Sequence, residues 1–474
     1  TSVKESKERI KSAIKNTKIE LRSRKILINL APSDIKKEGS GYDLPIAVGI
    51  LLAIGAIKKF NTKSTIFIGE LALDGKINKV PGILPICIEA KKNNIKTIYV
   101  PKENEKEAAI IKELEIIPVS TLEEVIKYIN GNKEPPKTKI KIEFQKEDYQ
   151  KYDIDFSDVK GQENAKRALE IAAAGGHNCL LIGSPGSGKT MLSERLITIL
   201  PDLTFEEALE ITKIHSISGE IEKGGGLRTI RPFRRPHHTS SPVSIIGGGR
   251  IPKPGEISLA HFGVLFLDEL PEFKKSTLEV LRGPLEDGNV TISRVNSTLT
   301  YPCNFMLIAS MNPCPCGYYG TDDSKCNCKE SSIQKYIGQV SGPLLDRIDL
   351  HIEVKPVEYK KVSSDEKVES SAEIKKRVNN ARKIQLERYK GLNIYSNSEL
   401  TPNLIERYCK LDKNSKIILE MAFERLGLSG RAYGRILKVA RTIADLDSSE
   451  KIEQKHVAEA IQYRNLDRKY WKRG

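Results

Sequence analysis

The chain has 474 residues, of which 39% are hydrophobic and 29% are charged. This length predicts about three domains, and the composition fits a soluble protein with real hydrophobic cores. The sequence contains no run of about 18 apolar residues, which excludes a transmembrane helix, so no membrane partner is expected. The eight cysteines do not suggest a secreted disulfide framework in a chain of this length. We therefore expect a cytoplasmic protein.

The net charge is +15 at neutral pH. Such an excess favours a polyanionic partner such as nucleic acid. A general preference for lysine in the source proteome would produce the same excess. The charge by itself therefore leaves both explanations open.

The first expected domain covers residues 1–131 and is of the α/β class. The chain opens TSVKESKERIKSAIK, without an initial Met or a signal peptide and inside an expected helix, so we expect a truncated N-terminus. Hydrophobic periodicity predicts helices and strands in alternation. The expected helices cover residues 3–16, 44–56, 83–93 and 122–130, and the expected strands cover residues 26–30, 65–70 and 97–100.

Two polar, linker-like stretches divide the rest of the chain. Residues 132–154 contain Pro135-Pro136 and many charges, and residues 357–370 are rich in Ser, Lys and Glu. Between them, residues 155–356 are expected to form a nucleotide-binding core. Residues 371–474 are expected to form a helical C-terminal lid. Its predicted helices cover residues 372–389, 404–408, 416–427, 430–446 and 455–464.

The strongest motif is GSPGSGKT, which follows the apolar run 179–182 and leads into an expected helix. Strand, glycine-rich loop and helix in this order are typical of a phosphate-binding loop. The glycines let backbone N–H groups turn towards a phosphate, and the helix N-terminus adds partial positive charge. We expect Lys189 to reach the β- and γ-phosphates of ATP, and the Thr190 hydroxyl to ligate Mg²⁺. The predicted ATP-binding residues are Gly183, Ser184, Pro185, Gly186, Ser187, Gly188, Lys189 and Thr190.

A second apolar strand, over residues 264–267, ends in Asp268 and Glu269. A phosphate-loop ATPase needs such an acidic pair beside its Mg²⁺. We expect Asp268 to hold the metal through a water molecule and Glu269 to orient or deprotonate the attacking water. An acidic pair at a strand end is common without any role, but here it accompanies a phosphate-binding loop.

Two further polar residues fit the same kind of site. A third apolar strand, over residues 305–309, leads to Asn312, which could sit beside the γ-phosphate; the alternative is a turn asparagine before Pro313. Arg347 follows a short amphipathic helix. An arginine from a neighbouring subunit could neutralise transition-state charge, whereas the alternative for Arg347 is a surface salt bridge.

Several segments carry a resemblance to a known family. They are HNCLLIGSPGSGKT, RPHHTSSPVSIIGGG, PGEISLAHFGVLFLDELPEF, LRGPLEDGNVTISR, NPCPCGYYG, SGPLLDRIDLH and LSGRAYGRILKVARTIADL. Through most of residues 155–466 the chain resembles the AAA+ ATPases, more closely their magnesium-chelatase-like branch, and most closely the ComM/YifB family of bacterial competence-associated ATPases. The resemblance implies a homo-hexameric ring in which Asn312 is sensor 1, Arg347 the arginine finger and Arg431 sensor 2.

Four cysteines stand in two close pairs within the insert 312–330. Four soft ligands suit tetrahedral Zn²⁺, and a site filled by four thiolates would be structural rather than catalytic. Each pair has a one-residue gap instead of the usual two-residue gap, so unligated thiols stay an alternative, whereas a disulfide is disfavoured in the cytoplasm. The predicted zinc ligands are Cys314, Cys316, Cys326 and Cys328.

Basic residues gather among glycines in residues 223–253. Glycine-rich basic loops can track a phosphate backbone. This segment falls where magnesium-chelatase-like ATPases insert a hairpin that lines the ring pore, and residues 288–302 form a second such region. His237 and His238 lack further ligands for a metal, and structural or subunit contacts are their alternative role. The predicted DNA contacts are Arg228, Arg231, Arg234, Arg235 and Arg294.

The first domain resembles the proteolytic domain of Lon through residues 36–41, 68–83 and 90–104. A Lon-type protease needs a Ser nucleophile beside a Lys base. Ser40 is displaced from the position expected for the nucleophile, and Leu84-Pro85 stand about where the Lys should be. We therefore expect a scaffold without proteolytic activity, whose first strands are missing from the truncated chain.

These motifs predict an ATPase that uses ATP and Mg²⁺. The family resemblance implies a helicase or branch-migration translocase acting on single-stranded or branched DNA in homologous recombination during natural transformation, with recombination proteins as further partners. Two alternatives stay open: an ATPase subunit of a magnesium chelatase, and an AAA+ chaperone that remodels proteins. The four-cysteine insert, the Lon-like domain and the basic segments argue against the chelatase. DNA-stimulated ATPase activity would discriminate the three.

Overall fold

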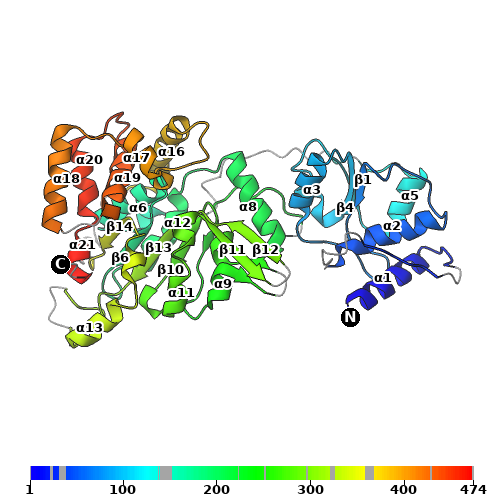
Figure 1. The fold of residues 1–474 in the computed structure, drawn as a ribbon, viewed down its shortest axis with the longest axis horizontal. Helices are drawn as coiled ribbons and strands as arrows, with labels where there is room; N and C mark the ends of the chain where they lie inside the picture. The colour runs from blue at the N-terminus through cyan, green and yellow to red at the C-terminus, as the bar shows by residue number, and fades with distance from the viewer. Residues whose placement is uncertain are drawn as a thin grey trace. The chain divides into compact units, whose positions relative to one another are not determined.

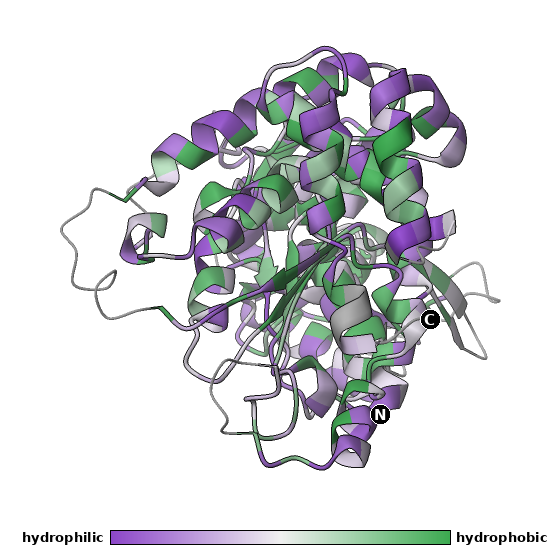
Figure 2. Ribbon diagram, turned by 90° about the vertical axis from the view of Figure 1, so that its left-hand side faces the viewer, coloured by the Kyte–Doolittle hydropathy of each residue, from purple (hydrophilic) through white to green (hydrophobic). Residues whose placement is uncertain are grey.

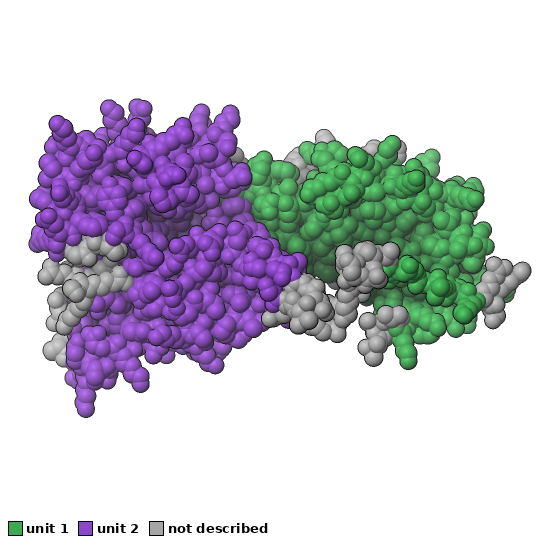
Figure 3. Space-filling view, in the orientation of Figure 1, with its two compact units in different colours: residues 1–145, 205–229 green, residues 146–204, 230–474 purple. Residues whose placement is uncertain are grey.

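The chain forms two compact units in the computed structural model. Unit 1 comprises residues 1–145 and 205–229, and unit 2 comprises residues 146–204 and 230–474 (Figure 3). The predicted linkers 132–154 and 357–370 lie largely outside the described residues. The residues that the structure describes are 2–21, 25–30, 39–136, 138, 152–222, 224–249, 252–294, 297–320, 326–357, 368–426 and 430–471.

Unit 1 is a layered α/β domain around a parallel three-stranded sheet. Alternate side chains of a strand point to opposite faces, so Tyr99 joins one hydrophobic core while Ile98 and Val100 join another. In sheet order, the strands are β1 (Thr65–Phe67), β4 (Thr97–Pro101) and β5 (Glu115–Val119), with a separate hairpin of β2 (Glu70–Leu71) and β3 (Ile77–Asn78). The first core includes α1 (Ser2–Asn16), α2 (Asp43–Ala53) and α5 (Leu122–Asn130), and the second includes α3 (Ile83–Lys92) and part of α4 (Glu105–Ala108) (Figure 1).

Residues 25–30 form no strand, which corrects the strand predicted over residues 26–30. Leu27 is 91% exposed and Ile28 is 49% exposed. An apolar run becomes a stable strand only when a neighbouring strand pairs with its backbone. Among the described residues, no strand pairs with this segment. Periodicity identifies the apolar run but cannot supply its partner.

Residues 205–229 belong to unit 1, although they interrupt unit 2 in the chain. Helix α8 (Phe205–Ser218) packs against α3. The carbonyl of Ser216 accepts a hydrogen bond from the Gly82 N–H at 2.9 Å, and its hydroxyl donates to Glu107 at 2.5 Å. The segment was expected within the nucleotide-binding core because periodicity predicts a helix but not the surface that it covers. The buried apolar residues of α8 are Ala208, Ile211 and Ile214.

Unit 2 contains a parallel five-stranded sheet. Three of its strands are buried along their whole length, which is typical of parallel sheets covered on both faces, and Figure 2 shows hydrophobic strands in the middle of the unit. All the strands run in the same direction, so their carboxyl ends meet at one edge. In sheet order, the strands are β14 (Leu350–Glu353), β6 (Cys179–Ile182), β13 (Met306–Met311), β10 (Val264–Leu267) and β7 (Phe233–Arg234).

The C-terminal helices pack with this sheet around one continuous hydrophobic core. Helix α6 (Glu163–Gly175) contacts both α16 and α19, so the helical lid is anchored to the sheet domain. Among the described residues, none of the helices combines the length and the apolar composition of a membrane span. The C-terminal helices are α16 (Ser371–Arg388), α17 (Pro402–Tyr408), α18 (Lys413–Leu426), α19 (Gly430–Leu446), α20 (Gln454–Gln462) and α21 (Leu466–Trp471).

Candidate ATP and metal sites

The phosphate-binding loop joins β6 to helix α7 (Lys189–Arg195). Gly186 and Gly188 have φ angles of 75° and 93°, which residues with a Cβ adopt only with strain. A Cβ added at Gly183 would lie 2.2 Å from the carbonyl oxygen of Val354. The glycines therefore permit both the turn and the close approach of β14. A turn of this kind is the backbone cradle that a phosphate group needs.

Lys189 lies in this cradle and touches the predicted sensor 1 residue. Its Nζ donates to the carbonyls of Gly183 at 2.8 Å and Ser184 at 2.9 Å, and lies 3.1 Å from Oδ1 of Asn312. Burial lowers the pKa of Lys189, although the neighbouring carboxylates oppose this shift. An ammonium group held by neutral oxygens can transfer its hydrogen bonds to the phosphates of a bound nucleotide.

Asp268 stands at the carboxyl end of β10, beside the loop. Oδ2 of Asp268 lies 3.2 Å from the Thr190 hydroxyl, and its Oδ1 accepts a hydrogen bond from Ser310 at 2.5 Å. Mg²⁺ prefers oxygen ligands and keeps several of its waters. A hydroxyl ligand from Thr190 and a water-mediated contact from Asp268 therefore fit Mg²⁺. Ser310, which sequence reasoning missed as a site residue, positions this carboxylate.

Glu269 has a left-handed backbone conformation, with φ at 55°. A residue other than Gly in this region carries a strain on the order of 1 kcal/mol. The Glu269 N–H donates to the Ser310 hydroxyl at 3.3 Å, so Ser310 supports both acidic residues. The turn leaves the Glu269 side chain exposed beside the metal site. Its carboxylate is available to accept a proton from water.

Arg347 lies at the opposite edge of the sheet from the phosphate-binding loop. It precedes β14, which runs parallel to β6 with Leu350 opposite Cys179, whereas the loop follows the other end of β6. The Arg347 Nη1 donates to the Pro343 carbonyl at 2.7 Å, and Nη2 pairs with Glu286. Arg347 therefore does not share a site with the phosphate-binding loop of its own chain.

Arg431 lies near the same edge, on α19. Its side chain is 62% exposed, and its Nη1 is 4.0 Å from Oδ2 of Asp346. Arg347 and Arg431 both line a cavity of ≈1200 Å³ between the sheet edge and the lid. Burial alone would raise the pKa of Asp349, which lines this cavity. The positive charge of Arg435, whose Nη1 lies 2.5 Å from Oδ1 of Asp349, contributes to a lowering that outweighs the effect of burial, so the pKa is below its usual value. The cavity brings together the two arginines that the family resemblance singled out.

The four sulfur atoms of the cysteine insert converge to within 4.8 Å of one another. The Cys314–Cys326 and Cys316–Cys326 distances are 3.8 and 3.7 Å, and Cys314–Cys316 is 3.3 Å. Sulfurs arranged tetrahedrally at about 2.3 Å from Zn²⁺ would be about 3.8 Å apart. With Cys328 as the fourth member, the donor set fits a structural Zn²⁺ site.

The cysteine cluster adjoins the ATP site. A Cβ added at Gly317 would lie 2.3 Å from Cδ of Pro185 in the phosphate-binding loop. Cys314 follows Asn312 by two residues, and Tyr336 of α13 (Glu330–Ile337) hydrogen-bonds the Asn312 backbone. A metal held by the cluster would therefore restrain the segment that carries Asn312.

Comparison with known proteins places this arrangement in a family. Three family models match the chain. The model described as magnesium chelatase, subunit ChlI, matches residues 155–362, and the model described as subunit ChlI of Mg-chelatase matches residues 1–104. The model of the ChlI C-terminal region matches residues 368–464. "Competence protein ComM" of Haemophilus influenzae is 43% identical over 98% of this chain and 91% of its own length. "Uncharacterized protein YifB" of Escherichia coli is 45% identical over 99% of this chain and 90% of its own length. The chain belongs to the ComM/YifB family.

Membership confirms the predicted α/β fold class of a magnesium-chelatase-like AAA+ protein. It also indicates an ATPase and implies that ATP and Mg²⁺ are used. The "Magnesium-chelatase 67 kDa subunit" of Chlorobaculum parvum is 28% identical over only 34% of this chain and 23% of its own length. Likeness to that chelatase subunit is thus restricted to part of the chain, whereas likeness to ComM and YifB covers nearly all of it.

The structure gives the predicted DNA-contacting arginines partners within the chain. Arg231 is 8% exposed, and its guanidinium donates to the carbonyls of Pro201 and Phe262, each at 2.7 Å. A buried guanidinium bonded to backbone carbonyls has a structural role, which corrects the prediction for Arg231. Each of three others contacts a neighbouring side chain: Arg228 contacts His215, Arg234 pairs with Glu256, and Arg235 pairs with Glu194 and Asp268.

The second predicted basic region forms a two-stranded hairpin. Strand β11 (Asn289–Arg294) pairs antiparallel with β12 (Ser297–Pro302), in agreement with the hairpin expected over residues 288–302. The side chain of Arg294 lies outside the described side chains. Its role as a DNA contact stays a prediction.

In unit 1, the hydroxyl of Ser40 donates to the carboxylate of Glu70. Leu84, which the resemblance to Lon places about where the Lys is expected, is fully buried in the hydrophobic core. A buried leucine cannot act as a base. The expected lack of proteolytic activity stays a prediction.

Proposed function

We propose that this protein is an ATP-driven DNA motor that unwinds or branch-migrates DNA in homologous recombination during natural transformation. The observation that carries the proposal is the likeness to "Competence protein ComM", which extends over 98% of this chain. The phosphate-binding loop and acidic pair supply the chemistry for ATP hydrolysis, and the net charge of +15 favours a polyanionic partner.

In the proposed reaction, bound Mg²⁺ would neutralise charge on the β- and γ-phosphates. Lys189 holds the phosphates, while Thr190 and Asp268 provide oxygens for the metal. Glu269 orients the attacking water and accepts its proton, and Asn312 lies beside Lys189, where it can contact the γ-phosphate. The Lys189–Asn312 and Thr190–Asp268 contacts support these roles. The role of Glu269 is supported by its place next to Asp268 and by its exposed side chain.

The positions of Arg347 and Arg431 support a ring. Both lie at the sheet edge opposite the phosphate-binding loop, so neither can complete the ATP site of its own chain. A head-to-tail interface repeated around a closed ring would place this edge against the loop of a neighbour. We propose a homo-hexamer in which each ATP site receives its arginines from the adjacent subunit.

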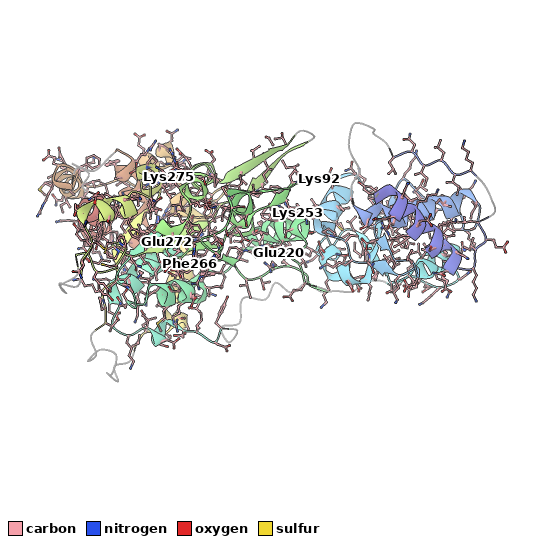
Figure 4. The ribbon with its side chains drawn as sticks, turned by 90° about the horizontal axis from the view of Figure 1, so that it is seen from below. Lys92, Glu220, Lys253, Phe266, Glu272 and Lys275 are labelled. Carbon is pink, nitrogen blue, oxygen red and sulfur yellow. The ribbon has the colours of Figure 1, made fainter. Side chains whose placement is uncertain are left out.

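The DNA-binding surface that we propose consists of the β11–β12 hairpin, with Arg294 near its tip, and the neighbouring small hairpin of β8 (Gly247–Gly248) and β9 (Lys253–Pro254). Lys253 is exposed and is labelled in Figure 4. The Tyr301 hydroxyl donates to the carbonyl of Pro252 at 3.0 Å, which ties the two hairpins together. Basic side chains on such joined hairpins would follow a phosphate backbone.

The test is ATP-dependent unwinding of a synthetic three-way DNA junction by the purified protein. Lys189→Ala serves as the control, because it removes the phosphate-binding ammonium. We expect strand separation and DNA-stimulated ATP hydrolysis with the unchanged protein and neither with the variant. If branched DNA does not stimulate ATP hydrolysis and its strands are not separated, the motor proposal is overturned. That result would favour a chelatase subunit or a protein-remodelling chaperone.

A further inference from the structure

Arg235 connects the basic segment after β7 with the magnesium site. Its Nη2 lies 2.6 Å from Oδ2 of Asp268, and its Nη1 lies 2.6 Å from Oε1 of Glu194 on α7. Its guanidinium carbon is 5.2 Å from the ring centroid of Phe266, a buried residue labelled in Figure 4. Three contacts from two elements thus direct one arginine towards the metal-binding carboxylate.

The fold explains this position. Strand β7 pairs with β10 in parallel, with Arg234 opposite Leu265. Arg235 therefore leaves the sheet at the same carboxyl edge at which Asp268 follows β10. Sequence reasoning assigned Arg235 to DNA because the pairing of β7 with β10 is not visible in the sequence.

The Asp268 carboxylate has a limited set of lone pairs, and protein groups already use most of them. Oδ1 accepts from Ser310, and both oxygens lie within 3.4 Å of the Thr190 hydroxyl. Oδ2 is the atom that Arg235 contacts. A water molecule bound to Mg²⁺ at Thr190 would need an acceptor on the side of the carboxylate that faces Thr190. Oδ2 is the oxygen nearer to the Thr190 hydroxyl, at 3.2 Å, and it is the one that Arg235 contacts. The metal-bound water and Arg235 would therefore compete for Oδ2.

We infer that Arg235 is a positioning residue that competes with Mg²⁺ for Asp268 and thereby raises the Mg²⁺ concentration required to fill the ATP site. When the metal and nucleotide bind, the guanidinium gives up Oδ2 and keeps its contact with Glu194. The inference rests on the proposed ATPase chemistry but not on DNA as the partner. Because Arg235 and Asp268 are 43% and 22% exposed, solvent weakens their attraction, and we expect an effect of about threefold rather than a hundredfold.

The experiment titrates Mg²⁺ at a fixed nucleotide concentration in the absence of DNA. One arm follows binding of a fluorescent ATP analogue, and the other follows ATP hydrolysis. Arg282→Gln is the matched control, because Arg282 is 40% exposed and pairs with Glu279 at 2.6 Å, away from the metal carboxylate. Arg235→Lys tests whether a cation at this position is sufficient.

We expect Arg235→Gln to lower the half-saturating Mg²⁺ concentration about threefold in both arms. Arg282→Gln should match the unchanged protein, and Arg235→Lys should lie closer to it than Arg235→Gln does. An unchanged or increased Mg²⁺ requirement in Arg235→Gln, or an equal shift in Arg282→Gln, would overturn the inference. If the unchanged protein binds the analogue with Mg²⁺ but hydrolyses no ATP, the proposed function fails, and the binding arm still tests the role of Arg235.

Discussion

At the scale of single residues, the ATP site combines side chains that a local motif reveals with others that only the packed strands reveal. Lys189 and Thr190 belong to a phosphate-binding motif, and Asp268 follows an apolar strand, so the sequence was sufficient to predict them. Ser310 and Arg235 were not recognised as parts of the metal site. Their contacts with Asp268 arise from strands β13 and β7, which lie on either side of β10.

Ser310 provides the first prediction. Ser310→Ala removes the hydrogen bonds that hold both Asp268 and the backbone of Glu269. We expect the rate of ATP hydrolysis at saturation to fall about tenfold, equivalent to about 1.4 kcal/mol, with less than about a twofold change in ATP affinity. Steady-state kinetics at saturating Mg²⁺ measure both parameters. Ser331→Ala on the exposed surface of α13 is the control, and equal kinetics for the two variants would contradict the assigned role.

His261 provides a prediction about pH. Burial lowers the pKa of His261 to about 3, and the charge of Arg231 adds to this effect, while its Nδ1 accepts from the Asn304 N–H at 3.0 Å. Its pKa in the unfolded chain is about 6.5, so the unfolded chain binds the additional proton between these values. The stability of unit 2 should therefore decrease as the pH falls below about 6.5, by about 2 kcal/mol at pH 5 from this group.

His261→Gln keeps a hydrogen-bond acceptor but removes the titration. Chemical denaturation at pH 7 and pH 5 should show a smaller loss of unfolding free energy in the variant than in the unchanged protein. Equal losses in the two proteins would show that His261 does not set this dependence.

At the scale of elements, packing against neighbours decided what periodicity left open. The predicted helices of the C-terminal region are present because each has an apolar face that the sheet domain or another helix covers. The run 26–30 has strand-like residues but no paired strand. The cysteine insert was recognised from composition, whereas its contact with Pro185 required the folded loop.

The insert carries the third prediction. We expect about one Zn²⁺ per chain in the purified protein, and loss of that metal in the Cys326→Ser/Cys328→Ser double variant. Because the cluster restrains the segment bearing Asn312, the variant should also hydrolyse ATP more slowly. Cys87→Ala, a buried cysteine of unit 1 outside the cluster, should retain the metal. Less than about half an equivalent of zinc in the unchanged protein would contradict the site.

At the scale of the whole molecule, the two parts of the proposed shared ATP site lie at opposite edges of one sheet. One edge of the unit 2 sheet carries the phosphate-binding loop, and the other carries Arg347. Helix α8 lies between two segments of unit 2 in the sequence but packs against α3 in unit 1. The opposite edges of the sheet and the packing of α8 each lead to a prediction.

The first concerns shared ATP sites. Lys189→Ala retains Arg347, and Arg347→Ala retains the phosphate-binding loop, so mixed rings of the proposed hexamer would contain interfaces with both parts intact. Each variant alone should lose nearly all ATP hydrolysis. After mixing and reassembly in equal amounts, roughly a quarter of the interfaces should be complete, and activity should return. Activity no greater than the sum of the separate variants would contradict shared sites.

The second concerns α8. A fragment of residues 152–474 lacks the surface that covers Ile211 and Ile214, so we expect it to aggregate. Replacing residues 205–229 with a short Gly-Ser linker should make the fragment monodisperse in size-exclusion chromatography. A short linker can close the gap because Pro201 and Arg231, which flank the removed segment, are in contact. The Nε of Arg231 lies 2.7 Å from the carbonyl oxygen of Pro201. Equal aggregation of both fragments would contradict this packing.

The sequence by itself determined the family, the phosphate-binding loop, the acidic pair and the cysteine insert, because these features depend on residue type and short spacing. Only the tertiary structure decided which strands lie side by side, and hence that Ser310 and Arg235 contact Asp268. It also placed Arg347 away from the loop and α8 in unit 1. Contacts between distant segments depend on strand order and on complementary surfaces, which local periodicity does not encode.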